Sequence, residues 1–161
     1  MNQSELVEQV VLAALSETFE NLVFEEVQVV GVEKFEPGLQ DFSSCWWAKI
    51  DMLEPVSGEL VLVAPQDLLI KFAESVFGMI DEQMPDQEQI FDNFGELMNT
   101  FCGRLIAGLL PENKSFRLGL PVIGDGAIPS GAGEFYLFNC LIGDNLVFLL
   151  MSHIFWEKIF P

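Results

Sequence analysis

Three polar side chains recur at helical spacing in the middle of the sequence. Asp92, Glu96 and Asn99 stand in a segment that is otherwise largely apolar. A helix turns by about 100° per residue, so with Asp92 at zero, Glu96 lies at about +40° and Asn99 at about −20°. A carboxylate and a carboxamide therefore share one exposed ridge. This pair suits docking on a cation and holding a water molecule for attack on a phosphoryl group.

Two glycines lie beside this ridge. Gly103 falls at about +20° on the same helical wheel, and Gly95 directly precedes Glu96. Glycine inside a helix costs about 1 kcal/mol relative to alanine, so we expect something to come close to the helix backbone here. Acids and amides on a helix surface are most often plain solvated residues. The glycines, and an asparagine in a helix interior that disfavours it, support a functional interpretation.

The ridge belongs to the longest helix that we expect in the chain. Asp86 and Gln89 form a capping-box pattern at its start, and Pro111 is predicted to end it. Apolar residues occupy the opposite side of the wheel, between about 140° and 220°. They are Ile90, Phe94, Leu97, Phe101 and Leu105. One side of the helix is thus built for a core and the other for solvent or a partner.

The remaining pattern predicts one domain over residues 1–161, with an α+β fold in which helices pack on a largely antiparallel sheet. Two runs of three strands, each preceded by a helix, indicate an internal pseudo-twofold repeat. We predict further helices at 3–19 and from Pro65 through Phe77, and strands at 26–34, 43–52, 59–64, 115–120, 134–142 and 145–152. Residues 79–86 are expected to form a linker, and 153–161 fit no element.

Charge and composition limit the partners. The net charge is −18 at pH 7, which argues against nucleic acid and anionic membranes. Two interpretations of this charge stay open: an acidic surface that keeps the protein soluble, or a surface that binds a partner with a basic face. No apolar run is long enough to span a membrane, and the N-terminus lacks the basic start of a signal peptide. Three scattered cysteines lack metal-ligand spacing and are typical of reduced thiols in a cytoplasmic protein.

Other chemistry-bearing residues give weaker signals. The glycine-rich loop at 124–133 lacks a P-loop lysine and leads into a strand, so we expect a strand connection more than a phosphate cradle. His153 is the only histidine, which argues against a metal site. Trp46 and Trp47 are adjacent in a predicted strand and should point to opposite faces of the sheet.

The ridge carries a family resemblance. The pattern Asp92-x3-Glu96-x2-Asn99, followed later by Pro121, resembles the motif of the CheC/CheX/FliY family of chemotaxis phosphatases. The run Gly95–Gly103 also resembles the active-site helix of that family, and the order of elements agrees along nearly the whole chain.

The first predicted helix holds an incomplete copy of the motif. CheC-type members carry two copies of the active-site helix. Here Ser4 and Glu8 have the right spacing, but Val11 stands where the amide is needed. Val11 also belongs to the apolar stripe predicted for this helix, which consists of Val7, Val11, Ala14 and Leu15. A single site in the second copy is the CheX pattern, and the resemblance then implies a homodimer whose sheets can join across an interface.

The resemblance implies a hydrolase that removes phosphate from the aspartyl phosphate of a CheY-like response regulator. Asn99 would orient the attacking water, and Glu96 would pair with a lysine beside the regulator's phosphorylation site. Mg²⁺ would be bound by the regulator, not by this chain. Gly95 and Gly103 would let the regulator approach, with Asp92 as an edge contact. Pro121 is expected to be structural.

Two alternatives stay open from the sequence. The resemblance extends to flagellar-switch components of similar fold that lack the acid-amide pair, so the chain could be a non-catalytic binding module. A small-molecule site at the 124–133 loop is the other alternative. An experiment can distinguish a binding module from a phosphatase, because a binding module would bind a regulator without accelerating phosphate release.

Overall fold

The computed structural model describes residues 2–23, 25–38, 41–77, 84–129 and 133–158. Its elements in chain order are α1 (Gln3–Val23), β1 (Val27–Lys34), β2 (Cys45–Glu54), β3 (Gly58–Pro65), α2 (Gln66–Phe77), α3 (Gln87–Leu109), β4 (Arg117–Leu118), β5 (Val122–Gly124), β6 (Phe135–Ile142), β7 (Asn145–Ser152) and α4 (Ile154–Lys158). In the described part of the chain no helix is long and apolar enough to cross a membrane.

In the described part of the chain, seven strands form one antiparallel sheet with a symmetric order. The path is β1-β6-β7-β3-β2-β4, and β5 also pairs with β2. Each strand of the first half has a counterpart in the second half: β1 corresponds to β4 and β5, β2 to β6, and β3 to β7. When every strand is replaced by its counterpart, the order reads the same from the opposite edge of the sheet. The two halves of the chain are therefore related by a pseudo-twofold axis between β3 and β7, which confirms the predicted repeat and fold class.

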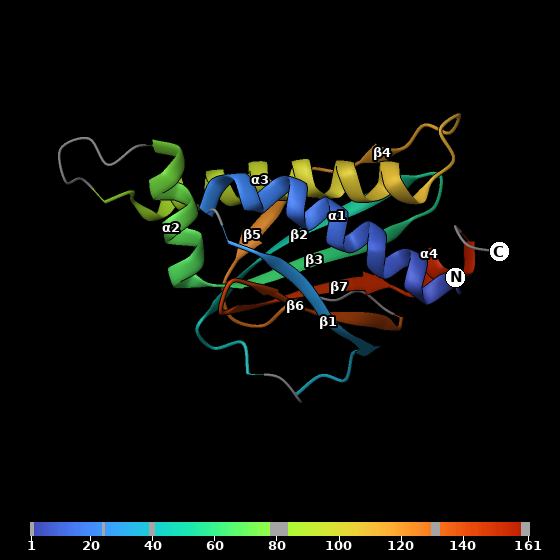
Figure 1. The fold of residues 1–161 in the computed structure, drawn as a ribbon, viewed down its shortest axis with the longest axis horizontal. Helices are drawn as coiled ribbons and strands as arrows, with labels where there is room; N and C mark the ends of the chain where they lie inside the picture. The colour runs from blue at the N-terminus through green and yellow to red at the C-terminus, as the bar shows by residue number, and fades with distance from the viewer. Residues whose placement is uncertain (1, 24, 39–40, 78–83, 130–132, 159–161) are drawn as a thin grey trace.

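Helices α1 and α3 lie side by side on one face of the sheet, and α2 stands at one end of this layer (Figure 1). The main core fills the space between helices and sheet. It contains the predicted apolar stripe of α1 (Val7, Val11, Ala14 and Leu15) and the apolar side of α3. Trp46 of β2 packs edge-on against Phe91 of α3, with ring centroids 5.2 Å apart. The site helix is thus fixed to the sheet along its length.

A smaller apolar cluster covers the other face of the sheet. Its buried members are Cys45, Val61, Val63, Phe135, Leu137, Phe148 and Leu150. Trp47 packs against this cluster, so the two tryptophans point to opposite faces as predicted. The Trp47 indole lies against Gly124, where an added Cβ would come within 2.6 Å of the ring, and its Nε1 donates to the Asp125 carbonyl at 3.3 Å. The start of the 124–133 loop is anchored there.

Most element boundaries agree with the sequence to within a few residues, and three predictions need correction. The strand predicted at 115–120 is only Arg117–Leu118. Within β4 the register against β2 shifts between Met52 and Glu54, and Pro121, which follows, has no N–H to donate to a ladder. A separate strand, β5, follows at Val122–Gly124, where the sequence predicted no strand. The unassigned tail contains α4, and the predicted linker at 79–86 lies mostly outside the described residues.

Packing of α1 on α3 depends on a glycine, which gives a stability prediction. A Cβ at Gly108 would lie 2.7 Å from Val10 Cγ1. Alanine favours a helix by about 1 kcal/mol over glycine, but the valine is held in one rotamer within α1 and cannot easily give way. We expect Gly108→Ala to lower the free energy of unfolding by about 1 kcal/mol or more, in urea titrations.

The matched control removes the obstacle. Truncation by Val10→Ala should make room for the methyl group that Gly108→Ala adds, so the double variant should be more stable than the sum of the two single changes predicts. Strict additivity of the two changes would show that the helices do not meet at this point.

Candidate functional site

Helix α3 starts on a well-formed cap. Asp86 Oδ1 accepts a hydrogen bond from Gln89 N at 2.8 Å, and Asp86 N donates to Gln89 Oε1 at 3.0 Å. This reciprocal pair is the capping box that the sequence predicts. The helix then runs without interruption to Leu109, so the spacing of the ridge residues is set by regular helical geometry.

The predicted ridge is a ridge in the structure. Asp92, Glu96 and Asn99 are exposed, whereas the intervening Phe94, Leu97 and Met98 are buried. Because the ridge is solvated and its apolar neighbours hold the helix, the three polar side chains can be replaced without opening the core. Their separation along the helix, from Asp92 to Asn99, spans about two turns.

Within the described residues, neither Asp92 nor Glu96 takes part in an ion pair. The cations whose pairs are described bind other acids: Lys34 with Glu134, Lys49 with Asp51 and Glu59, Lys71 with Glu25, Arg104 with Glu17, and Arg117 with Glu54. The two ridge carboxylates are therefore available to a cation brought by another molecule.

The two glycines beside the ridge differ in their surroundings. Gly95 is buried, and a Cβ there would touch Pro121 Cγ at 3.5 Å and Ile123 Cδ1 at 3.7 Å. These are ordinary van der Waals distances, so β5 packs along α3 at this point and the packing does not itself require a glycine. The sequence did not single out Ile123, although its alternation with Pro121 along a short strand was an available signal. Gly103 is half-buried, and a Cβ there would meet no described atom of another element within 4 Å.

The family is identified from the part of the sequence that contains the ridge and β5. Residues 47–129 match the family model described as chemotaxis phosphatase CheX, which is more than half of the chain. The chain belongs to the CheX family. The match includes all of α3 with Glu96 and Asn99, together with Pro121.

Solved structures of related proteins share the fold. CheX from Vibrio vulnificus is 16% identical, with a TM-score of 0.72 over 89% of this chain and 95% of that chain. The CheX in a CheX–CheY–BeF3–Mg²⁺ complex from Borrelia burgdorferi is 15% identical, with a TM-score of 0.62 over 94% and 97%. The FliM middle domain from H. pylori is 12% identical, with a TM-score of 0.66 over 99% and 98%. No curated protein sequence matches the chain significantly.

The described first half of this CheX-family chain lacks a corresponding acid-amide pair. Val11 of α1 is fully buried in the main core, as its place in the apolar stripe predicts. Ser4 Oγ donates to Glu8 Oε1 at 3.3 Å, so the two remaining polar side chains of this copy bind each other. An amide at position 11 would face the core instead of solvent. The acid-amide ridge therefore exists once in the described structure, on α3.

Other nucleophiles are poorly placed for catalysis. The three cysteines are free and buried, and burial raises the pKa of Cys140 to about 12 and that of Cys102 further still. His153 Nδ1 lies 3.2 Å from Glu157 Oε1, and its ring stacks on Tyr136. Among the described residues there is no group of three or more His, Cys, Asp or Glu side chains that could hold a metal ion.

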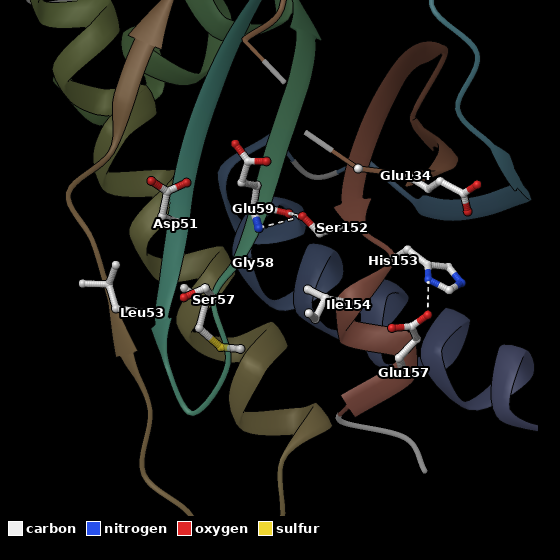
Figure 2. Close-up of a pocket in the computed structure, with 12 residues that line it drawn as sticks. Asp51, Leu53, Ser57, Gly58, Glu59, Glu134, Ser152, His153, Ile154 and Glu157 are labelled. Carbon is white, nitrogen blue, oxygen red and sulfur yellow. Dashed lines mark hydrogen bonds and ion pairs between the residues drawn. The ribbon is translucent and has the colours of Figure 1, made fainter. Parts of the chain in front are cut away.

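A pocket of ≈ 640 Å³ lies where β2, β3 and β7 meet the turn before α4 (Figure 2). Its polar walls are tied to one another. Ser152 Oγ accepts from Glu59 N at 2.8 Å, and Lys49 Nζ lies 2.7 Å from Glu59 Oε1, a hydrogen bond that raises the pKa of Lys49. Figure 2 shows His153 and Glu157 facing each other at its rim. None of the ridge residues lines this pocket.

A second, more apolar hollow of ≈ 400 Å³ borders the 124–133 loop. It is lined by Phe35, Pro37, Gly38, Phe42, Ser43, Gly126, Ala127 and Ile128. These side chains carry no charge, so the hollow offers no basic group for a phosphate. Residues 130–132 of the loop lie outside the described part of the chain.

Proposed function

We propose that this CheX-family protein hydrolyses the aspartyl phosphate of a CheY-like response regulator, and that Glu96 and Asn99 are the residues that act on it. The observation that carries the proposal is an exposed acid-amide pair on an uninterrupted helix, with no cation of the described chain bound to the acid. The family match and the Borrelia CheX–CheY complex support the choice of regulator.

In the proposed reaction, the main task of the protein is to position the attacking water molecule. An acyl phosphate is already activated, so water can attack the phosphorus in line and expel the aspartate carboxylate, which leaves aspartate and inorganic phosphate. The Asn99 amide would accept a hydrogen bond from this water and donate one to a phosphoryl oxygen. The Mg²⁺ that neutralises the phosphoryl charge would be held by the regulator. Placing water correctly is worth several powers of ten in such reactions.

Glu96 would provide the docking register. A carboxylate repels a phosphoryl group, so its useful partner is a cation beside that group, for which a regulator lysine is the proposed candidate. Asp92 lies one turn before Glu96 and would contact the edge of the same partner. Gly95 is buried where α3 faces Pro121 and Ile123, so its part would lie in the packing of α3 on β5 and not in a contact with the partner. We place the reaction in the cytoplasm and assign it to a single domain spanning residues 1–161.

We also propose that the protein is a homodimer in which the sheets of two copies join. The β4–β5 edge exposes two large apolar side chains, Leu120 and Val122, with 88% and 56% of their surfaces accessible. An exposed apolar strand at a sheet edge is a template for pairing with another chain. Light scattering should then give twice the chain mass, and Val122→Lys should shift the protein toward monomer. A wild-type mass of 18.0 kDa would contradict this.

A non-catalytic binding module is the alternative, because the FliM middle domain shares the fold. The intact, exposed acid-amide pair favours catalysis. The experiment that separates the two follows phosphate release from each CheY-type regulator of the same organism, phosphorylated in Mg²⁺, with substoichiometric protein. Release faster than the regulator's own decay, with many turnovers per molecule, supports the phosphatase. Complex formation without acceleration would support the binding module instead.

A further inference from the structure

Helix α3 contains three glycines, and close packing calls for glycine at only one of them. At Gly108 an added Cβ would lie 2.7 Å from Val10 Cγ1, whereas at the buried Gly95 it would meet Pro121 Cγ and Ile123 Cδ1 at ordinary van der Waals distances of 3.5 and 3.7 Å. At Gly103 an added Cβ would meet no described atom within 4 Å beyond its chain neighbours and the backbone of α3 itself. Its φ is not in the left-handed region, so the backbone conformation does not demand glycine either. Within the described structure, Gly103 weakens the helix without a packing or conformational reason.

The position of Gly103 connects it to the proposed site. It follows Asn99 by four residues, so it lies one turn further along the same side of α3. The line from Asp92 through Glu96 and Asn99 to Gly103 covers about 16 Å of helix surface. A partner that places a phosphoryl group at Asn99 and a cation at Glu96 therefore passes over, or ends close to, Gly103.

We infer that Gly103 is a contact point at which the backbone of the phosphorylated CheY-like regulator lies against the backbone of α3. The inference rests on the proposed function and assigns to Gly103 a part that Gly95 does not share. Any side chain at position 103 would hold the partner away from the helix. A displacement of about 1 Å at the reacting centre can cost about 100-fold in rate, so even a methyl group matters here.

The test is Gly103→Ala, measured for stability, for regulator binding and for phosphate release. Because the methyl group would meet no described atom of another element within 4 Å, the free protein should become more stable, with Tm raised by about 2–4 °C. Binding to a regulator activated with BeF3⁻ and Mg²⁺, which mimic the phosphoryl state, should weaken by at least about tenfold, and kcat/KM should fall by about 10–100-fold. Stability and function thus change in opposite directions.

A compensating change separates docking from stability. Ala107 is exposed one turn beyond Gly103, and Ala107→Gly removes a methyl group instead of adding one. It should lower Tm by a similar amount and leave binding unchanged. The double variant G103A/A107G should return Tm to the wild-type value and keep the binding defect of G103A. Recovery of binding in the double variant would overturn the inference, because the defect would then follow stability.

The remaining outcomes are also decisive. A more stable G103A with wild-type affinity and rate would overturn the inference and leave the phosphatase standing. A G103A protein that is less stable or unfolded would contradict the open space at Gly103 on which the inference rests. If wild type bound none of the BeF3⁻-activated regulators and accelerated no phosphate release, the inference and the proposed function would fall together.

Discussion

Replacing Asn99 by alanine should lower the catalysed rate of regulator dephosphorylation by at least about 100-fold, because no other described group on the ridge can both donate to and accept from the attacking water. The fold should survive. Asn99 is exposed, and alanine is the better helix former by a few tenths of a kcal/mol, so Tm should stay equal or rise slightly. Stopped-flow or quench measurements with phosphorylated regulator give the rate, and thermal unfolding gives Tm.

Two control variants sharpen this prediction. Thr100 is the exposed neighbour of Asn99 and lies about 100° away around the helix, so Thr100→Ala should retain nearly the wild-type rate. Asn99→Asp has almost the same shape but loses the N–H donor and adds a negative charge next to the phosphoryl group. It should be as inactive as the alanine variant. Equal losses in Thr100→Ala and Asn99→Ala would indicate damage to the helix instead of a missing amide.

Replacing Glu96 by alanine should act mainly on binding. The carboxylate has no ion-pair partner among the described residues, so its loss should leave stability unchanged. In the complex it would lose a charge-assisted pair with the regulator's lysine, of about 2–3 kcal/mol, which corresponds to about 30- to 150-fold in Kd. Titration calorimetry with BeF3⁻-activated regulator measures this. The rate at saturating regulator should fall less than in Asn99→Ala.

A double-mutant cycle identifies the partner of Glu96. When the lysine beside the regulator's phosphorylation site is replaced by alanine, the additional change Glu96→Ala should cost little, since the pair is already broken. Asp92→Ala is the matched acid on the same ridge and should weaken binding by less than Glu96→Ala. Additive effects of the Glu96 and lysine changes would show that these two residues do not meet.

The site helix was predictable from the sequence because its signals are local. The capping box at Asp86 and Gln89 and the 3.6-residue period of apolar residues each depend on neighbours within one or two turns. The exposure of Glu96 and Asn99 then follows from helical geometry alone. The burial of Val11 follows in the same way from the stripe on α1, so the absence of a second site in the first half was also predictable.

The features that depend on distant parts of the chain were not predictable. Both glycines of the ridge had the same interpretation in the sequence, as openings for a partner. The position of β5 distinguishes them, since Gly95 is buried and faces Pro121 and Ile123, whereas a Cβ at Gly103 would meet no described atom of another element within 4 Å. The shortening of the predicted strand at 115–120 and the separate pairing of β5 likewise depend on the register against β2, which no local pattern encodes. These features are set by tertiary packing and not by the local secondary-structure propensity of the residues.

The role of Asn99 is tested most directly by single-turnover loss of phosphate from a phosphorylated CheY-type regulator in Mg²⁺, with wild type and Asn99→Ala measured in parallel. We expect wild type, in excess over the regulator, to accelerate the loss by at least about 100-fold relative to Asn99→Ala, while both proteins bind the BeF3⁻-activated regulator with similar affinity. Equal acceleration by the two proteins would contradict the proposed mechanism, because the amide of Asn99 would then have no part in the reaction.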